Sequence, residues 1–113
     1  MKIIEEKISL DELKKMAQNT FGDFVKAVVD VRKQIMAVDA ELHADLEALL
    51  LENRSKQADL WGINIYPELE GEDFVEFDSM INLRPSQENR SREVEDPKIR
   101  EKIKTIIGKL VRK

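Results

Sequence analysis

The stretch Phe24–Glu52 is FVKAVVDVRKQIMAVDAELHADLEALLLE, and its conformation decides the fold of this 113-residue chain. No glycine or proline interrupts it, and apolar residues recur at helical spacing from Val28 to Leu49. Its first part, however, is rich in β-branched residues, which favour strands, and residues 32–34 have the polar composition of a turn. Periodicity therefore slightly favours a helix, whereas propensity favours strands in the first part only.

The segments on either side of this stretch begin with clear helix signals. Ser9 and Glu12 form a capping box, in which the Ser9 hydroxyl accepts from the Glu12 amide and the Glu12 side chain reaches back. Gly22 is a suitable left-handed stop for that helix. Asp96 followed by Pro97 is a cap residue before proline at the first helical position, which predicts a second helix at the C-terminal end.

Residues 59–84 have the composition of β structure. Residues 59–67 are rich in aromatic and β-branched residues and end at Pro67. From Phe74 to Arg84 apolar and polar residues then alternate, with Val75, Phe77, Ile81 and Leu83 on one face. This alternation predicts a half-buried antiparallel strand over residues 74–84.

Several segments together resemble a family of short prokaryotic proteins that is classed as a domain of unknown function. They are HAD (43–45), LWGINIYP (60–67), EFDSMIN (76–82), RPSQ (84–87) and NRSR (89–92). The resemblance spans nearly the whole chain and brings no established activity. It implies glycines near the positions of Gln34, Asp39, Ala40 and Arg54, which this chain lacks, and hairpins rather than one long helix. On that basis we expect strands over residues 24–52.

The fold expected from these signals is of the α+β class. Residues 1–113 form one domain, with an antiparallel meander of about four to five strands. The N-terminal and C-terminal helices pack on one face of this sheet, and the opposite face is acidic and wet.

Composition and charge exclude several classes of protein. There is no cysteine for a disulfide or a thiolate site, and no apolar run long enough to cross a membrane, so we expect a cytoplasmic protein. The start of the chain is too acidic for a signal peptide. Residues 41–78 carry eleven acids against two bases, whereas residues 84–113 carry ten bases against five acids. The acidic middle would repel a phosphate backbone, which argues against nucleic acid as a partner.

The first candidate site is the arginine-rich segment between Leu83 and Pro97. Arginine forks and amide groups suit a carboxylate or a phosphate. The candidate residues for binding a small anion or an acidic partner are Arg84, Gln87, Asn89, Arg90 and Arg92. The competing interpretation, which we favour, is that these groups satisfy neighbouring acids and the backbone of the loop itself.

The second candidate site contains the single histidine. In a strand, His43, Asp45 and Glu47 would share one face, which suits proton transfer or a divalent cation. His43 and Asp45 are thus the candidate catalytic residues. A plain solvated sheet face is the favoured alternative, and we expect no metal site and no cofactor. If residues 41–52 are helical instead, His43 still meets Glu47 but Asp45 points elsewhere.

These observations predict a small binding or assembly domain, with the arginine loop contacting an anion or an acidic protein partner and a homodimer possible. The alternative is a small hydrolase or ribonuclease-like enzyme that uses His43 with the loop arginines.

Overall fold

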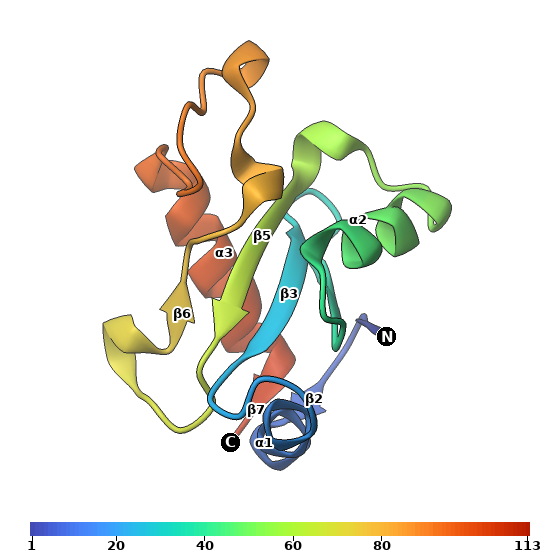
Figure 1. The fold of residues 1–113 in the computed structure, drawn as a ribbon, viewed down its shortest axis with the longest axis vertical. Coiled ribbons are helices and arrows are strands. Elements are labelled where there is room, and N and C mark those ends of the chain that lie inside the picture. The colour runs from blue at the N-terminus through green and yellow to red at the C-terminus, as the bar shows by residue number, and fades with distance from the viewer.

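A computed structural model describes residues 1–113 and shows a five-stranded antiparallel sheet with three α-helices (Figure 1). The sheet contains β1 (Lys2–Ile4), β3 (Val25–Asp30), β4 (Ile35–Val38), β5 (Leu60–Ile65) and β6 (Val75–Glu76). A second, parallel pair joins β2 (Ile8–Ser9) to β7 (Val111–Arg112). The α-helices are α1 (Leu10–Asn19), α2 (His43–Glu52) and α3 (Pro97–Leu110). Four 3-10 turns complete the chain: η1 (Gln57–Asp59), η2 (Gly71–Asp73), η3 (Met80–Asn82) and η4 (Pro85–Gln87).

The α+β class is confirmed, but the path of the strands is not a simple meander. The sheet order is β1-β4-β3-β5-β6, and every neighbouring pair is antiparallel. β3 and β4 form a hairpin, after which the chain crosses over β3 through α2 and returns as β5 on the other side. Strands that are consecutive in sequence are therefore not always neighbours in the sheet.

The predicted helix caps of α1 and α3 are confirmed. The Ser9 hydroxyl accepts a hydrogen bond from the Glu12 amide at 3.1 Å, and the Asp96 carboxylate accepts from the Lys98 amide at 2.9 Å. The Glu12 carboxylate does not close the capping box, since it accepts from Lys2 Nζ at 3.1 Å. Gly22 ends the α1 segment with φ +94°, and its amide donates to the Ala17 carbonyl at 2.6 Å.

The larger core lies between one face of the sheet and the two terminal helices, as predicted. Leu13 and Ala17 of α1 and Ile103 and Ile106 of α3 pack in one cluster with apolar side chains of β3, β4 and β5. In Figure 1 α3 runs behind the sheet, whereas α2 lies in front of it. The structure thus has a helix on each side of the sheet.

The expectation of strands throughout residues 24–52 is correct for β3 and β4 and wrong for residues 43–52, which form α2. Leu46 and Leu50, one helical turn apart, are both buried against the sheet. Leucine, alanine and glutamate, which dominate this segment, are strong helix formers. The β-branched residues that favour strands end at Val38.

The prediction of a wet opposite face is therefore wrong for half of that face. Leu46 and Leu50 of α2 cover Val28, Ala37 and Leu60 and form a second apolar cluster. Beyond the N-terminal end of α2, the same face carries the polar residues Lys26, Asn64 and Glu76. These three occupy neighbouring positions on β3, β5 and β6.

The predicted strand over residues 74–84 is also wrong beyond Glu76. Only β6 pairs with β5, after which the chain turns into η3. The Ser79 hydroxyl accepts from the Ile81 amide at 3.2 Å and starts this turn. As a result Val75 and Phe77 pack against the larger core, Ile81 packs against the α2 cluster, and Leu83 is exposed.

Three of the four positions at which the family resemblance implies glycine have a left-handed backbone. Gln34, Asp39 and Arg54 have φ values of +60°, +75° and +70°. Side chains disfavour this conformation, which glycine adopts freely. The turns that the resemblance implies are therefore present, although this chain builds them without glycine.

Candidate functional site

η3 and the arginine-rich segment that follows it cover the part of β5 that has no neighbouring strand. β6 pairs only with Asn64 and Ile65, which leaves the outer edge of β5 open near Gly62. There the Gly62 amide donates to Asn82 Oδ1 at 2.8 Å, and Asn82 Nδ2 donates to the Gly62 carbonyl at 2.9 Å. A buried side-chain amide thus occupies the position of a missing strand.

Arg84 continues this edge with a buried guanidinium. It donates to the carbonyls of Ile81 at 2.8 Å, Gln57 at 2.9 Å and Leu60. Its guanidinium carbon lies 4.8 Å from the centre of the Trp61 ring, and its Nη2 lies 3.7 Å from Glu47 Oε2 of α2. Burial lowers the pKa of Arg84, and the charge of Glu47 acts in the opposite direction.

The side chains of Asn89 and Gln87 form hydrogen bonds that fix the conformation of the same loop. Asn89 Nδ2 donates to the carbonyls of Asn82 at 2.7 Å and Glu93 at 2.6 Å, and its Oδ1 accepts from the Glu95 amide at 2.9 Å. Gln87 contacts Arg84 at 3.4 Å through Oε1 and the Ala58 carbonyl at 3.3 Å through Nε2. Three of the five predicted anion-binding residues, Arg84, Gln87 and Asn89, therefore bond to backbone groups of the chain itself.

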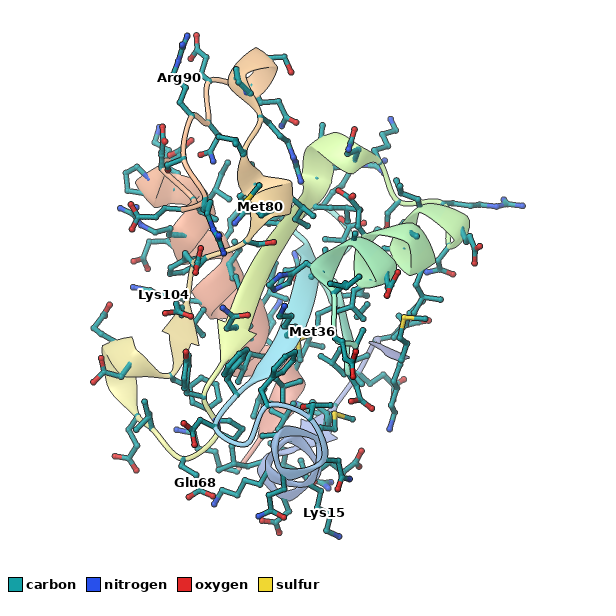
Figure 2. All side chains as sticks on the ribbon, viewed as in Figure 1. Lys15, Met36, Glu68, Met80, Arg90 and Lys104 are labelled. Atoms are coloured by element: carbon teal, nitrogen blue, oxygen red, sulfur yellow. The ribbon has the colours of Figure 1, made fainter.

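The other two arginines of the loop lie at the surface. Arg90 is exposed at the tip of the loop, where Figure 2 labels it, and forms no ion pair within the chain. Arg92 Nε donates to Asp78 Oδ1 at 2.7 Å, in a pair of which both side chains are about half exposed. Solvent and salt screen such a pair, so its contribution to stability is small.

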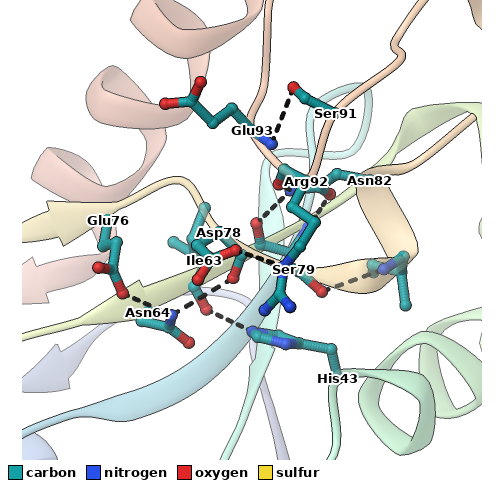
Figure 3. Close-up of polar contacts among 12 residues, drawn as sticks. His43, Ile63, Asn64, Glu76, Asp78, Ser79, Asn82, Ser91, Arg92 and Glu93 are labelled. Carbon is teal, nitrogen blue, oxygen red and sulfur yellow. Dashed lines mark hydrogen bonds and ion pairs between the residues drawn. The ribbon is translucent and has the colours of Figure 1, made fainter.

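His43 lies at the start of α2 and is nearly buried (Figure 3). Its Nε2 lies 2.7 Å from the Ile63 carbonyl, and because a carbonyl only accepts, Nε2 carries the proton of this bond. Burial lowers the pKa of His43, although the bond to Ile63 and the charge of Asp78 act to raise it. The imidazole is therefore held in its neutral form near pH 7.

Polar groups of β5 and β6 surround His43. Asn64 Nδ2 donates to Glu76 Oε1 at 2.8 Å and to the Asp78 carbonyl at 3.3 Å, and the Tyr66 hydroxyl lies 3.1 Å from Glu76 Oε1. Asn64 Oδ1 is buried and has no donor. Asp78, which pairs with Arg92, brings that arginine into the same cluster as His43 (Figure 3). No group of three or more histidine or acidic side chains is arranged to hold a metal ion.

The predicted alignment of His43, Asp45 and Glu47 on one strand face is wrong, because these residues are helical. Asp45 is exposed, whereas His43 is buried and Glu47 is mostly buried beside Arg84. The alternative in which residues 41–52 are helical describes the observed geometry: His43 and Glu47 share the inner face of α2.

The largest hollow of the surface lies on the other side of the sheet. It has a volume of about 890 Å³ and runs along α3 beside the β3–β4 turn. Its charged border consists of Arg32, Lys98, Lys102 and Lys109 with the acids Asp59 and Glu101. We call this hollow the α3 groove. None of Arg32, Lys98 and Lys102 forms an ion pair within the chain.

A second hollow of about 570 Å³ continues the α3 groove toward the arginine loop. The two share Val31, Asp59, Pro97 and Lys102 in their walls. Gln87 and Asn89 line the far side of the second hollow, and Trp61, the only tryptophan of the chain, lines it as well. The second hollow is the acidic end, since Glu88, Glu95 and Asp96 join Asp59 there.

The fold, the polar cluster at His43 and the α3 groove define a small α+β protein without a recognisable catalytic motif. The family "Protein of unknown function (DUF5674)" matches residues 2–110, and the chain belongs to this family. No curated protein and no solved structure matches the chain. None of the helices combines the length and the apolar character that crossing a bilayer requires.

Sequence reasoning did not identify the α3 groove, because its residues come from separate parts of the chain. Arg32 lies in the β3–β4 turn, whereas Lys98, Lys102 and Lys109 lie along α3. The signal present in the sequence was the surplus of bases over residues 84–113. That surplus was weighed only as a basic face for nucleic acid, whereas the structure places its unpaired bases Lys98 and Lys102 in the wall of a hollow.

Proposed function

We propose that this protein is a small binding domain that recognises an acidic segment of a partner protein in the α3 groove. The observation that carries this proposal is the largest hollow of the surface, bordered by four bases and two acids. None of the four bases has an acidic partner within the chain, so their charge is available to a ligand. Lys109 Nζ donates only to the neutral Gln34 Oε1, at 2.9 Å.

The arrangement of charge in the fold supports this choice. The acidic residues of α2 lie on the opposite side of the sheet from α3, so they do not neutralise the α3 groove (Figure 1). The arginine loop is a weaker candidate for the contact, since Arg84 and Asn89 are buried in bonds to the chain itself. Arg92 pairs with Asp78, and the hollow between the α3 groove and the arginine loop is acidic, so the loop lies outside the proposed contact.

An acidic polypeptide fits the groove better than a nucleic acid does. Binding to nucleic acid rests largely on neutralising backbone phosphates with bases, and a protein with a basic face can make about six to ten such contacts. The α3 groove offers four bases, and the hollow that continues it is acidic. A short run of carboxylates needs fewer contacts than a nucleic acid does, and it ends before it reaches the acidic hollow.

A titration with hexaglutamate, followed by the fluorescence of Trp61, tests the proposal. We expect saturable binding that weakens with salt, since exposed charges are screened. Lys102→Glu reverses a base of the groove and is expected to weaken binding roughly tenfold. The matched control is Lys15→Glu on α1, which makes the same change of charge at an exposed lysine outside the groove and is expected to leave binding unchanged.

Two results of this titration would overturn the proposal. One is the absence of saturable binding of hexaglutamate, observed both by fluorescence and by calorimetry. The other is tighter binding of a single-stranded oligonucleotide than of hexaglutamate, which would make the groove a nucleic-acid site. Inorganic phosphate serves as a third probe and measures how much of the affinity comes from charge alone.

A small hydrolase or ribonuclease-like enzyme is the second candidate. The observation in its favour is that His43, Asp78 and Arg92 share one polar cluster. Against it, His43 is nearly buried and lines neither the α3 groove nor the hollow that continues it, and Asp45 lies outside the cluster. Cleavage of RNA or of an ester that disappears in His43→Ala, with the fold retained, would favour this candidate instead.

A further inference from the structure

The outer face of α2 is unusually apolar for a surface helix. Ala44, Ala48 and Leu51 are exposed at helical spacing, while Leu46 and Leu50 are buried on the inner side. A surface helix normally carries polar residues on the side away from the core. Apolar residues on both sides of α2 therefore indicate that its outer face contacts a second surface.

Other exposed apolar side chains lie beside this face. Leu42 directly precedes α2 and is 57% exposed. Met80 of η3, labelled in Figure 2, is 62% exposed, and Leu83 follows the same turn. η3 contacts α2, and Ile81 packs in the core beneath the helix. We call Ala44, Ala48, Leu51, Leu42, Met80 and Leu83 the α2 patch.

The exposed charges of α2 and of the residues just before it are all negative. Asp45 and Glu52 are exposed on the helix, Glu41 is exposed before it, and residues 41–53 contain no lysine or arginine. Two copies of the patch cannot face each other closely, because acid would meet acid. The surface that covers the patch must therefore carry bases.

The α3 groove has this chemistry and lies on the opposite side of the same molecule. Its bases Lys98 and Lys109 are eleven positions apart on one helix, which corresponds to about 16 Å. α2 contains ten residues and is about 15 Å long. The helix and the groove thus agree in length and are opposite in charge.

We infer that α2 of one copy of this chain docks into the α3 groove of a second copy. The inference rests on the proposed function and names the acidic segment as residues 41–52 of another copy. Docking of a helix in a groove is a common mode of recognition. The contact joins two different surfaces, so it is head-to-tail and extends to further copies unless it closes into a ring.

The contact is small, and this determines its expected strength. A single ten-residue helix buries less area than a standard stable interface. Association is therefore expected only at high protein concentration and is expected to weaken as salt is added. By contrast, a twofold dimer formed through β1, at the edge of the sheet, would not depend on the α2 patch or on the α3 groove.

Sedimentation velocity on two blocked variants and their mixture tests the inference. Ala48→Lys places a base at the centre of the α2 patch and leaves the groove intact, whereas Lys102→Glu reverses a base of the groove and leaves the patch intact. Both positions are exposed. Each variant alone is expected to remain monomeric where the wild-type protein associates, with affinity lowered roughly tenfold or more.

The equimolar mixture of the two variants is expected to form 1:1 complexes and nothing larger. In it, the intact groove of Ala48→Lys receives the intact α2 of Lys102→Glu, and both remaining surfaces are blocked. Gln18→Lys and Lys15→Glu, which make the same charge changes on α1, are the matched controls and are expected to associate like the wild type.

A mixture that stays monomeric would overturn the inference, as would association that persists unchanged in either variant alone. A wild-type protein that is monomeric at every concentration and salt would overturn it too. If hexaglutamate still binds the groove in that last case, the proposed function stands and only the identity of the partner is wrong.

Discussion

Asn82 forms with Gly62 the pair of hydrogen bonds that a neighbouring strand would form, with N···O distances of 2.8 Å and 2.9 Å. Unpaired edge strands expose amides and carbonyls that can recruit other chains. Here one buried side chain satisfies both groups of Gly62, and Arg84 satisfies the Leu60 carbonyl beside it. The arginine-rich loop is therefore part of the sheet edge.

Replacing Asn82 by alanine is expected to lower the free energy of unfolding by about 2–4 kcal/mol, because the buried amide and carbonyl of Gly62 lose their partners. Urea denaturation followed by far-UV circular dichroism measures this. Leu83→Ala, an exposed neighbour, is the control and should change the stability by less than about 0.5 kcal/mol. Equal stability of the two variants would contradict the role assigned to Asn82.

Arg84→Met is expected to lower the free energy of unfolding by about 3–5 kcal/mol, because it leaves Glu47 without its buried counter-charge. Glu47→Gln in the same chain removes the orphaned charge and should recover part of this loss. A double-mutant cycle from urea denaturation gives the coupling energy of the pair. A coupling energy near zero would show that solvent screens Glu47 from Arg84.

Gly62→Ala tests the close packing of η3 on β5. A Cβ at this position would lie 2.5 Å from Ser79 Cβ, closer than real contacts allow. We expect a loss of about 1–3 kcal/mol in the free energy of unfolding from overpacking. Gly108→Ala, at an exposed helical position with open space, should instead be neutral or stabilising. Thermal melts of the two variants provide the comparison.

Arg54→Gly is expected to raise the free energy of unfolding by about 0.5–1 kcal/mol, because Arg54 has φ +70° and its side chain forms no hydrogen bond or ion pair. Arg54→Ala removes the same side chain without relieving the backbone and is the control. If both variants gain equally, the charge of Arg54 and not its backbone conformation would be the cause.

Burial of His43 makes the stability depend on pH in a defined direction. Because its pKa is lower in the folded protein than in the unfolded chain, the unfolded chain binds more protons as the pH falls below about 6.5. The stabilisation is therefore fully present above the unfolded-state pKa and is lost as the pH falls toward the folded-state value.

Denaturation of wild type and His43→Gln between about pH 8 and pH 5 measures this effect. The stability of the wild type relative to the variant is expected to fall on acidification. The titration of the His43 ring proton by NMR should show a midpoint below the ordinary histidine pKa. A difference in stability that is constant with pH, or grows on acidification, would contradict the assignment.

Local signals in the sequence predicted the helix termini and the main strands, because those features depend on neighbouring residues. Ser9 and Asp96 cap helices through bonds to amides two or three positions away. The β-branched runs around Val28 and Ile63 form strands. The turn at Gln34 was indicated by the polar residues 32–34 and by the resemblance, whereas the turn at Arg54 followed from the resemblance alone.

The failures concern features that depend on distant contacts. Residues 74–84 alternate like a strand, but the partner that Asn82 finds at Gly62 is twenty positions away and ends the alternation. α2 was missed because the hairpins implied by the family resemblance were extended over the whole of residues 24–52, although the helical periodicity of its second part favoured a helix. The interpretation of the arginine loop as largely self-satisfying agrees with the bonds of Arg84 and Asn89. The α3 groove could not be predicted either, because it exists only where the fold places the β3–β4 turn beside α3.

The central functional claim is that acidic partners bind the α3 groove, and amide chemical-shift mapping by NMR during addition of hexaglutamate tests it most directly. We expect the perturbed amides to cluster at Arg32 and along α3 from Lys98 to Lys109. Perturbations centred on residues 86–92 of the arginine loop, or no perturbation at saturating hexaglutamate, would contradict it.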